Sequence, residues 1–137
     1  MAYAGYLIKL GGSGGTILPD RFIKAEGYEI TPNQRMEVEA KRSVTGVLYR
    51  STVEHTATKI EINTPNMTNT DVAELMALLR SFWTSNIERK LILEYYDIET
   101  DSYKTGTFYM PDIKFHISHA DSNSITYKET RLAFIEY

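Results

Sequence analysis

The chain has 137 residues, the length of one domain, and its formal net charge of −3 argues against a nucleic-acid-binding surface, which needs clustered basic residues. It contains no cysteine, which excludes disulfides, thiol nucleophiles and cysteine metal sites. No apolar run approaches the ~20 residues of a membrane span, and the first residues lack the basic start of a signal peptide. We therefore expect a single soluble domain over residues 1–137 that is not secreted by the standard route and is assembled in the cytoplasm.

Short strands are expected near the start of the chain, over residues 3–10 and 16–18. The residues between them, 11–15, are four glycines and one serine. Because glycine restricts the backbone so little, this composition predicts a flexible connection without a fixed shape, such as a laboratory linker also has. A third strand is expected over residues 22–31. Pro32 and Asn33 should end it, because both residue types favour turns.

Residues 34–53 predict an extended β-hairpin, here called the hairpin arm. Apolar and polar residues alternate on both sides of a turn at residues 44–47. Two strands of about seven residues reach ~23 Å beyond a core. An isolated two-stranded hairpin is only marginally stable, so we expect the arm to lie on a neighbouring subunit. The alternative is a hairpin that folds back on its own sheet.

One amphipathic helix is predicted over about residues 68–84. Thr68 and Asp71 have the spacing of a capping box at its start. Six apolar residues then recur at helical spacing and predict a stripe that packs into the core: Val72, Leu75, Met76, Leu79, Phe82 and Trp83. Because strands are expected on both sides of it in the sequence, the helix should cover one open side of a β-structure.

The rest of the chain has the alternation of strands. Further strands are expected over residues 56–63, 89–96, 103–110, 113–119 and 125–137. In residues 113–119 the alternation is cleanest, and Ile113, Phe115 and Ile117 are expected to face the core. About eight strands with short turns and one helix predict a mainly β fold: a β-sandwich or barrel with a helical lid and an extended hairpin.

We expect no catalytic, cofactor-binding or metal-binding residues, and therefore no enzyme. Neither the three histidines nor any serine lies in a metal-ligand or nucleophile motif. Asp97, Glu99 and Asp101 have the first spacings of a calcium-binding loop, but Ser102 and Phe108 stand where such a loop needs glycine and glutamate. A weak cation site and an acidic hairpin loop are the alternatives there, and the hairpin loop is favoured.

Ten tyrosines are more than a chain of this length is expected to have. Tyrosine is enriched in the cores of interfaces, and rings aligned on a sheet also stack on sugars. We favour packing between subunits over sugar binding. The expected subunit-interface residues lie on the hairpin arm and on two later strands: Met36, Val38, Val47, Tyr49, Tyr96 and Tyr109.

Several stretches resemble a family of small proteins encoded among the tail genes of long-tailed bacteriophages and prophages. These stretches are residues 7–12 (LIKLGG), 28–35 (YEITPNQR), 94–97 (EYYD), 100–109 (TDSYKTGTFY) and 133–137 (AFIEY). The order of the expected elements is also similar to that of tail-tube proteins and of the ring-forming domain of distal tail proteins.

The resemblance implies a structural virion protein, a ring-forming component of a phage tail in its tube, at its distal end or in a tail-completion ring. It implies self-association into hexameric rings whose sheets join into an inner barrel, together with contacts to other tail proteins. Genomic DNA would only pass through the lumen, and the protein would be located in the virion tail. The alternative function is a tyrosine-rich carbohydrate-binding module at the tail tip, and a small hydrolase is a less favoured third.

Overall fold

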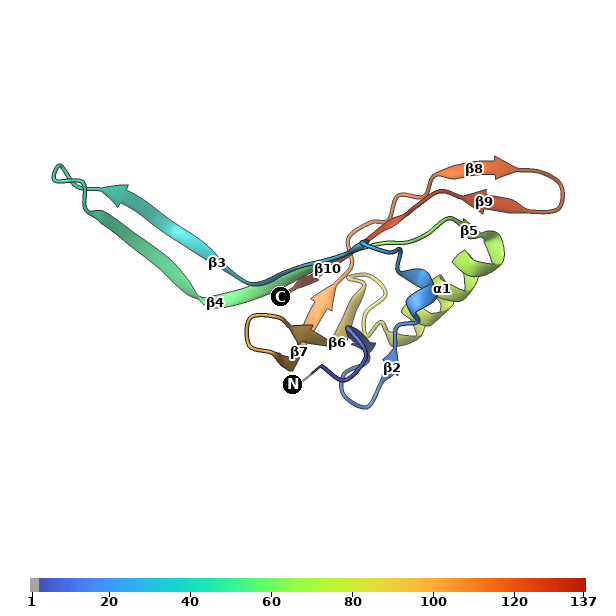
Figure 1. The fold of residues 1–137 in the computed structure, drawn as a ribbon, viewed down its shortest axis with the longest axis horizontal. Helices are drawn as coiled ribbons and strands as arrows, with labels where there is room; N and C mark the ends of the chain where they lie inside the picture. The colour runs from blue at the N-terminus through green and yellow to red at the C-terminus, as the bar shows by residue number, and fades with distance from the viewer. Residues whose placement is uncertain (1–2) are drawn as a thin grey trace.

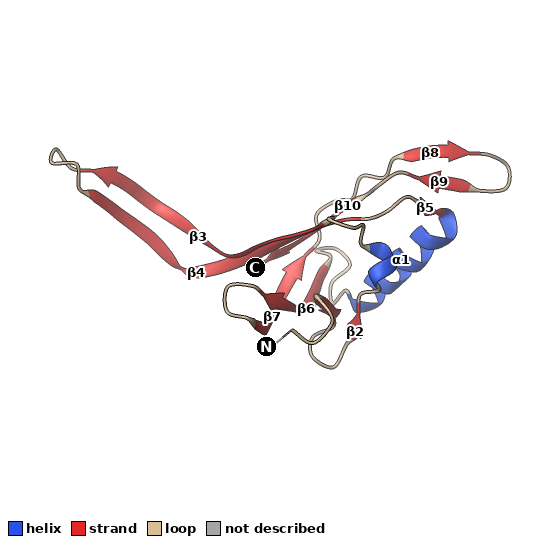
Figure 2. Cartoon of the chain, viewed as in Figure 1, coloured by secondary structure: helices blue, strands red, loops and turns tan. Residues whose placement is uncertain are grey.

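The computed structural model describes residues 3–137, apart from the side chains of residues 36–38 and 52–53. The molecule is elongated, with a central body, the hairpin arm at one end and a shorter hairpin at the other (Figure 1). The described residues form these elements: β1 (Ile8–Leu10), β2 (Thr16–Ile17), the 3-10 helix η1 (Asp20–Phe22), β3 (Tyr28–Arg42), β4 (Leu48–Asn63), β5 (Met67–Thr68), α1 (Asn69–Phe82), β6 (Lys90–Asp97), β7 (Ser102–Tyr109), β8 (Ile117–Ala120), β9 (Ile125–Tyr127) and β10 (Arg131–Glu136). This mainly β chain with one α-helix and an extended hairpin confirms the predicted fold class (Figure 2).

Seven strands form one antiparallel sheet in the order β2-β1-β6-β7-β10-β4-β3. Side chains alternate between the two faces of a strand, and the apolar ones gather on one face of this sheet. On that face Leu91 and Leu93 of β6 and Ile60 and Ile62 of β4 are fully buried. The core lies between this face and α1.

Helix α1 starts after Thr68, where the predicted capping box is confirmed. The backbone N–H of Asp71 donates to Thr68 Oγ1 at 3.4 Å, and the N–H of Thr68 donates to Asp71 Oδ2 at 3.2 Å. Leu75 and Leu79 are buried, and the other residues of the apolar stripe are partly buried against the core: Val72, Met76, Phe82 and Trp83. The helix therefore covers one face of the large sheet.

A second antiparallel sheet is formed by β5, β9 and β8. The prediction of an inward-facing strand over residues 113–119 is wrong, because β8 begins only at Ile117 and both Phe115 and Ile117 are exposed. The ring of Phe115 contacts that of Tyr127, with 6.1 Å between centroids, while Ile113 packs against the core. Alternation shows that a strand has two unlike faces, but not that either face meets the core.

Strand β3 continues through Pro32 and Asn33, so the predicted strand end at these residues is wrong. Because β3 lies at the edge of the large sheet, it tolerates a proline without an N–H to donate. Asn33 has a left-handed φ of 50°, and the pairing register shifts between Thr31 and Gln34. The two residues therefore form an irregularity within one long strand, and the hairpin arm is continuous with strands of the core.

Residues 11–15 form a tight turn between β1 and β2, instead of the expected connection without a fixed shape. Gly11 has a φ of 86°, and a Cβ here would lie 2.7 Å from the ring of Phe82. A Cβ on Gly15 would overlap the carbonyl oxygen of Leu10. Close packing therefore requires these glycines, although their composition by itself signals flexibility.

We expect Gly15→Ala to lower the free energy of unfolding by about 1–3 kcal/mol, because the new Cβ overlaps the backbone of Leu10. Gly14→Ala is the matched control, since no atom lies within 4 Å of a Cβ at that position. It should be neutral or slightly stabilising. Urea unfolding of both variants measures the difference, and equal stabilities would show that the turn is looser than described.

We expect Leu79→Ala to lower the free energy of unfolding by ~2–5 kcal/mol, because it leaves a cavity between α1 and the large sheet. The control is the same substitution at Leu48, which is 44% exposed on the hairpin arm and should change stability by no more than about 0.5 kcal/mol. Denaturant melts compare the two. Similar losses would contradict the assignment of the helix face to the core.

Candidate assembly interface

The tip of the hairpin arm, residues 39–51, has a regular local structure. Its strands pair as far as Arg42 opposite Leu48. The backbone N–H of Ser43 donates to the carbonyl oxygen of Val47 at 2.8 Å and closes the turn predicted at this place. These local bonds hold the shape of a tip that projects away from the body (Figure 1).

Large apolar side chains at the arm tip are open to solvent. Val44 is fully exposed, and the exposed fractions of Val47, Leu48 and Tyr49 are 53%, 44% and 64%. A two-stranded hairpin has no core in which to bury such residues. Exposed apolar side chains gathered in one place are typical of surfaces that bind another protein. The tip is therefore the part of this molecule that gains most from being covered by another surface.

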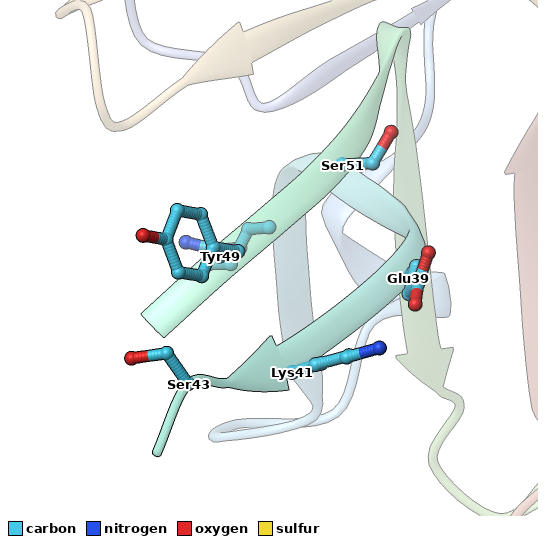
Figure 3. Close-up of a pocket in the computed structure, with 6 residues that line it drawn as sticks. Glu39, Lys41, Ser43, Tyr49 and Ser51 are labelled. Carbon is cyan, nitrogen blue, oxygen red and sulfur yellow. The ribbon is translucent and has the colours of Figure 1, made fainter. Parts of the chain in front are cut away.

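A hollow of about 380 Å³ lies along the arm tip (Figure 3). It is lined by charged, hydroxyl and aromatic side chains: Glu39, Lys41, Ser43, Tyr49, Arg50 and Ser51. Glu39 pairs with Ser51 and Lys41 with Tyr49, so these four residues share one face of the hairpin. Nowhere in the described part of the chain do three acidic or histidine side chains gather to hold a metal ion. The hollow is suited to polar contacts with another polypeptide.

Both strands of the arm are joined to the body at one cluster of side chains, here called the arm root: Asn33, Thr58, Tyr95, Asp97 and Lys104. Asn33 Nδ2 donates to Asp97 Oδ2 at 3.0 Å, and Lys104 Nζ lies 2.7 Å from the same oxygen. Thr58 Oγ1 accepts from the N–H of Asn33 at 3.1 Å and lies 3.1 Å from the hydroxyl of Tyr95. Thr58, Tyr95 and Asp97 are buried, whereas Asn33 and Lys104 are partly exposed, so the root extends from the interior of the protein to its surface.

Asp97 is charged although its side chain is buried. Burial raises the pKa of a carboxyl group, but hydrogen bonds from Lys104, from Asn33 and from the N–H of Glu99 outweigh this effect and hold the pKa of Asp97 below its ordinary value. The N–H of Glu99 lies 3.0 Å from Asp97 Oδ1. The carboxylate therefore has partners on both oxygens, as a buried charge requires.

The acidic loop after β6 has protein partners where a cation would otherwise bind. Asp97 pairs with Lys104, and Glu99 Oε1 accepts a second hydrogen bond from Asn33 Nδ2 at 3.1 Å. Asp101 accepts a hydrogen bond from a tyrosine hydroxyl. Asp97 and Glu99 therefore share Asn33 as a donor and Asp101 has a separate one, so donors from the protein engage all three carboxylates. This arrangement favours the acidic hairpin loop over the weak cation site.

Tyrosines on the outer face of the large sheet, the face away from α1, contact one another. Tyr6 stacks on Tyr103 with 4.6 Å between ring centroids, and Tyr96 makes edge contacts of 5.6 Å with both Tyr3 and Tyr103. The hydroxyl of Tyr103 donates to the carbonyl oxygen of Tyr6 at 2.7 Å, and that of Tyr6 donates to Glu94. Because these ring faces and hydroxyls are engaged within the protein, the cluster is poorly suited to stacking on a sugar.

The four described residues among the six predicted interface residues lie on two separate surfaces. Val47 and Tyr49 are exposed at the arm tip, whereas Tyr96 and Tyr109 are half-buried on the outer face of the large sheet. The other two calls, on the side chains of Met36 and Val38, lie outside the described residues. The four described residues therefore do not form one site.

Sequence reasoning misses the arm root. The sequence signal for the arm root is the Pro32-Asn33 pair within an alternating pattern. Such a pair occurs at a bulge of an edge strand as well as in a turn. Asp97 and Lys104 come from the next hairpin along the chain, β6 and β7, and no local pattern connects them with Asn33. The exposure of Val44 at the turn is also missed, because a turn residue has no expected face.

Comparisons with known proteins place the chain in a family. Residues 1–137 match the model of DUF6711, which is described as a family of unknown function. The chain belongs to this family. A search of curated proteins gives no match.

The DUF6711 chain is also similar to a chain in a solved structure, the tail of an empty GTA particle computed with helical refinement and C6 symmetry. The two chains are 17% identical, with 99% of this chain and 95% of that chain covered, and the TM-score is 0.53. The likeness shows a shared fold. Among the described residues of the DUF6711 chain, α1 is too short and too polar to cross a membrane.

We expect Asp97→Asn to lower the free energy of unfolding by about 1–3 kcal/mol at neutral pH, because Lys104 and Asn33 lose a charged acceptor. The pKa of Asp97 is lowered in the folded protein, so its contribution is present above the unfolded pKa of about 3.9 and is lost as the pH falls below it. The difference between native and variant proteins should therefore shrink below about pH 4. Denaturant melts from pH 7 downward measure this difference, and a difference that stays constant would contradict the ion pair between Asp97 and Lys104.

Proposed function

We propose that this DUF6711 protein is a structural, non-enzymatic component of a bacteriophage tail and that its copies join into a ring. The observation that carries the proposal is the exposed apolar tip on an arm that projects from the body. The fold shared with a chain of a C6-symmetric particle tail supports both a tail location and a sixfold ring. The protein would be assembled in the host cytoplasm and reside in the virion tail, with other tail proteins as neighbours.

A ring follows from the position of the arm. The tip lies at one end of an elongated molecule, and its contact with the body of another copy would join two different surfaces. Repeating such a contact generates a closed ring when the rotation between copies closes, and an open filament when it does not. Association also covers β3, which is a 15-residue strand at the edge of the large sheet. Long exposed edges otherwise pair with unrelated chains.

Charge favours a second copy as the partner of the tip. Residues 39–51 contain three basic side chains and one acidic one, whereas the whole chain has a net charge of −3. The rest of the chain is therefore acidic, and a basic tip is attracted to the body of another copy. An acidic body also lets genomic DNA pass through a lumen without binding its phosphates.

We expect Val44→Asp to prevent ring formation without unfolding the protein, because it places a charge on the fully exposed apolar residue of the arm tip. Ile87→Asp is the matched control, since Ile87 is also exposed, at 97%, but lies in the body after α1. Mass photometry and size-exclusion chromatography should show a species of about six copies for the native and Ile87→Asp proteins and a monomer for Val44→Asp.

All three proteins should share one melting temperature. A native protein that stays monomeric at tens of micromolar, both alone and with neighbouring tail proteins, contradicts the ring. If both variants assemble as the native protein does, the ring does not use the arm tip.

A further inference from the structure

The hairpin arm meets the body where its pairing is irregular. Pairing is regular up to Thr31 opposite Lys59. The register shifts before Gln34 opposite Ala57, and twice more between Arg35 and Glu39. Asn33, between Thr31 and Gln34, has a left-handed φ of 50°. Such a conformation costs free energy in a non-glycine residue and persists where surrounding contacts hold it.

The contacts of Asn33 reach the body through its side chain. Both donors of its amide group are used, one on Asp97 Oδ2 at 3.0 Å and one on Glu99 Oε1 at 3.1 Å. Asp97 is itself held by Lys104 Nζ at 2.7 Å. An amide that donates to two separate carboxylates is fixed in its plane as well as in its position, because hydrogen bonds depend on angle.

The partner strand of the arm is held at the same level. Thr58 is fully buried, its hydroxyl accepts from the N–H of Asn33, and its own N–H donates to Glu136 Oε1 at 2.9 Å. Further out, His55 Nε2 lies 2.8 Å from the carbonyl oxygen of Tyr137. Both strands of the arm are thus bonded to β6 and β10 before they leave the body.

We propose that Asn33 is a positioning residue, which fixes the direction in which the hairpin arm leaves the body. The arm acts as a lever: the eleven residue steps from Asn33 to Val44 span roughly 36 Å, so a rotation of about 10° at the root moves the tip by roughly 6 Å. This displacement exceeds the ~4 Å range of an apolar contact. The consequence for assembly rests on the proposed ring, whereas the direction of the arm is a property of the single chain.

A purely stabilising role for the arm root predicts a different result. In that case the loss of Asn33 lowers stability and leaves the folded molecules with the same arm direction. A distance from the body to the tip, measured in folded monomers, separates the two roles. The chain has no cysteine, so two labels can be attached at Val44→Cys and Ile87→Cys, both fully or nearly fully exposed in the native protein.

The experiment compares nitroxide distance distributions by double electron–electron resonance in dilute, monomeric protein. Asn33→Gly removes the amide while keeping the left-handed backbone without strain. Glu26→Gly is the matched control, because Glu26 also has a left-handed φ, 64°, but is exposed and lies outside the arm root. We expect the distribution of Asn33→Gly to broaden about twofold or to shift, and that of Glu26→Gly to match the parent.

Glu99→Ala provides a second variant that removes one acceptor of Asn33 from an exposed position and leaves the core intact. It should broaden the distribution less than Asn33→Gly. If Asn33→Gly does not fold, a parent-like distribution in Glu99→Ala overturns the proposal. If both variants fold and the distance distribution changes only in Asn33→Gly, the proposal still holds. The hydrogen bond from Asn33 to Asp97 is then the one that fixes the arm. Parent-like distributions in both variants, or an equal change in Glu26→Gly, overturn it.

The ring assay keeps this inference separate from the proposed function. If the native protein forms rings, Asn33→Gly should require about tenfold more protein to assemble, which corresponds to ~1.4 kcal/mol per contact. If the native protein forms no rings while Asn33→Gly loses the arm direction, the ring fails and the positioning role stands. If rings form and the distances do not change, the positioning role fails and the ring stands.

Discussion

The pairing of β4 with β10 is the contact on which the rest of the molecule depends. Ile60 and Ile62 of β4 are fully buried opposite Phe134 and Leu132 of β10. Burial of each such side chain contributes about 1.5–3 kcal/mol. Because β4 is one continuous strand of 16 residues, this pairing in the core also holds the arm, which has no core of its own. The length of the arm is thus supported by residues that lie outside it.

Features that depend on neighbours in the sequence were predictable. Thr68 and Asp71 are three residues apart, and their capping box needs nothing else to form. The stripe of α1 and the turn at the arm tip are local in the same sense. The mainly β fold followed from alternation, because a strand with unlike faces belongs to a sheet whichever strands lie beside it.

Features that depend on distant partners were not predictable. Phe115 and Ile117 alternate as core residues do, yet they face solvent. Ile117 begins β8, which pairs in the small sheet, and Phe115 lies in the segment before that strand. Gly11 is fixed by the ring of Phe82, which is about seventy residues away in the sequence. The acceptors of Asn33 are equally distant. In each case the local pattern gives the conformations that the backbone can adopt, and a remote side chain selects one of them.

The polar character of the arm root has a physical reason. An ion pair between the buried Asp97 and the partly exposed Lys104 adds little stability that apolar side chains of the same volume would not add. Apolar contacts, however, are not directional, and a strand resting on them can rotate at small cost. Two carboxylates that accept from one planar amide allow a single orientation of Asn33. Directional bonds at the root therefore suit a long arm whose tip must reach one place on its partner.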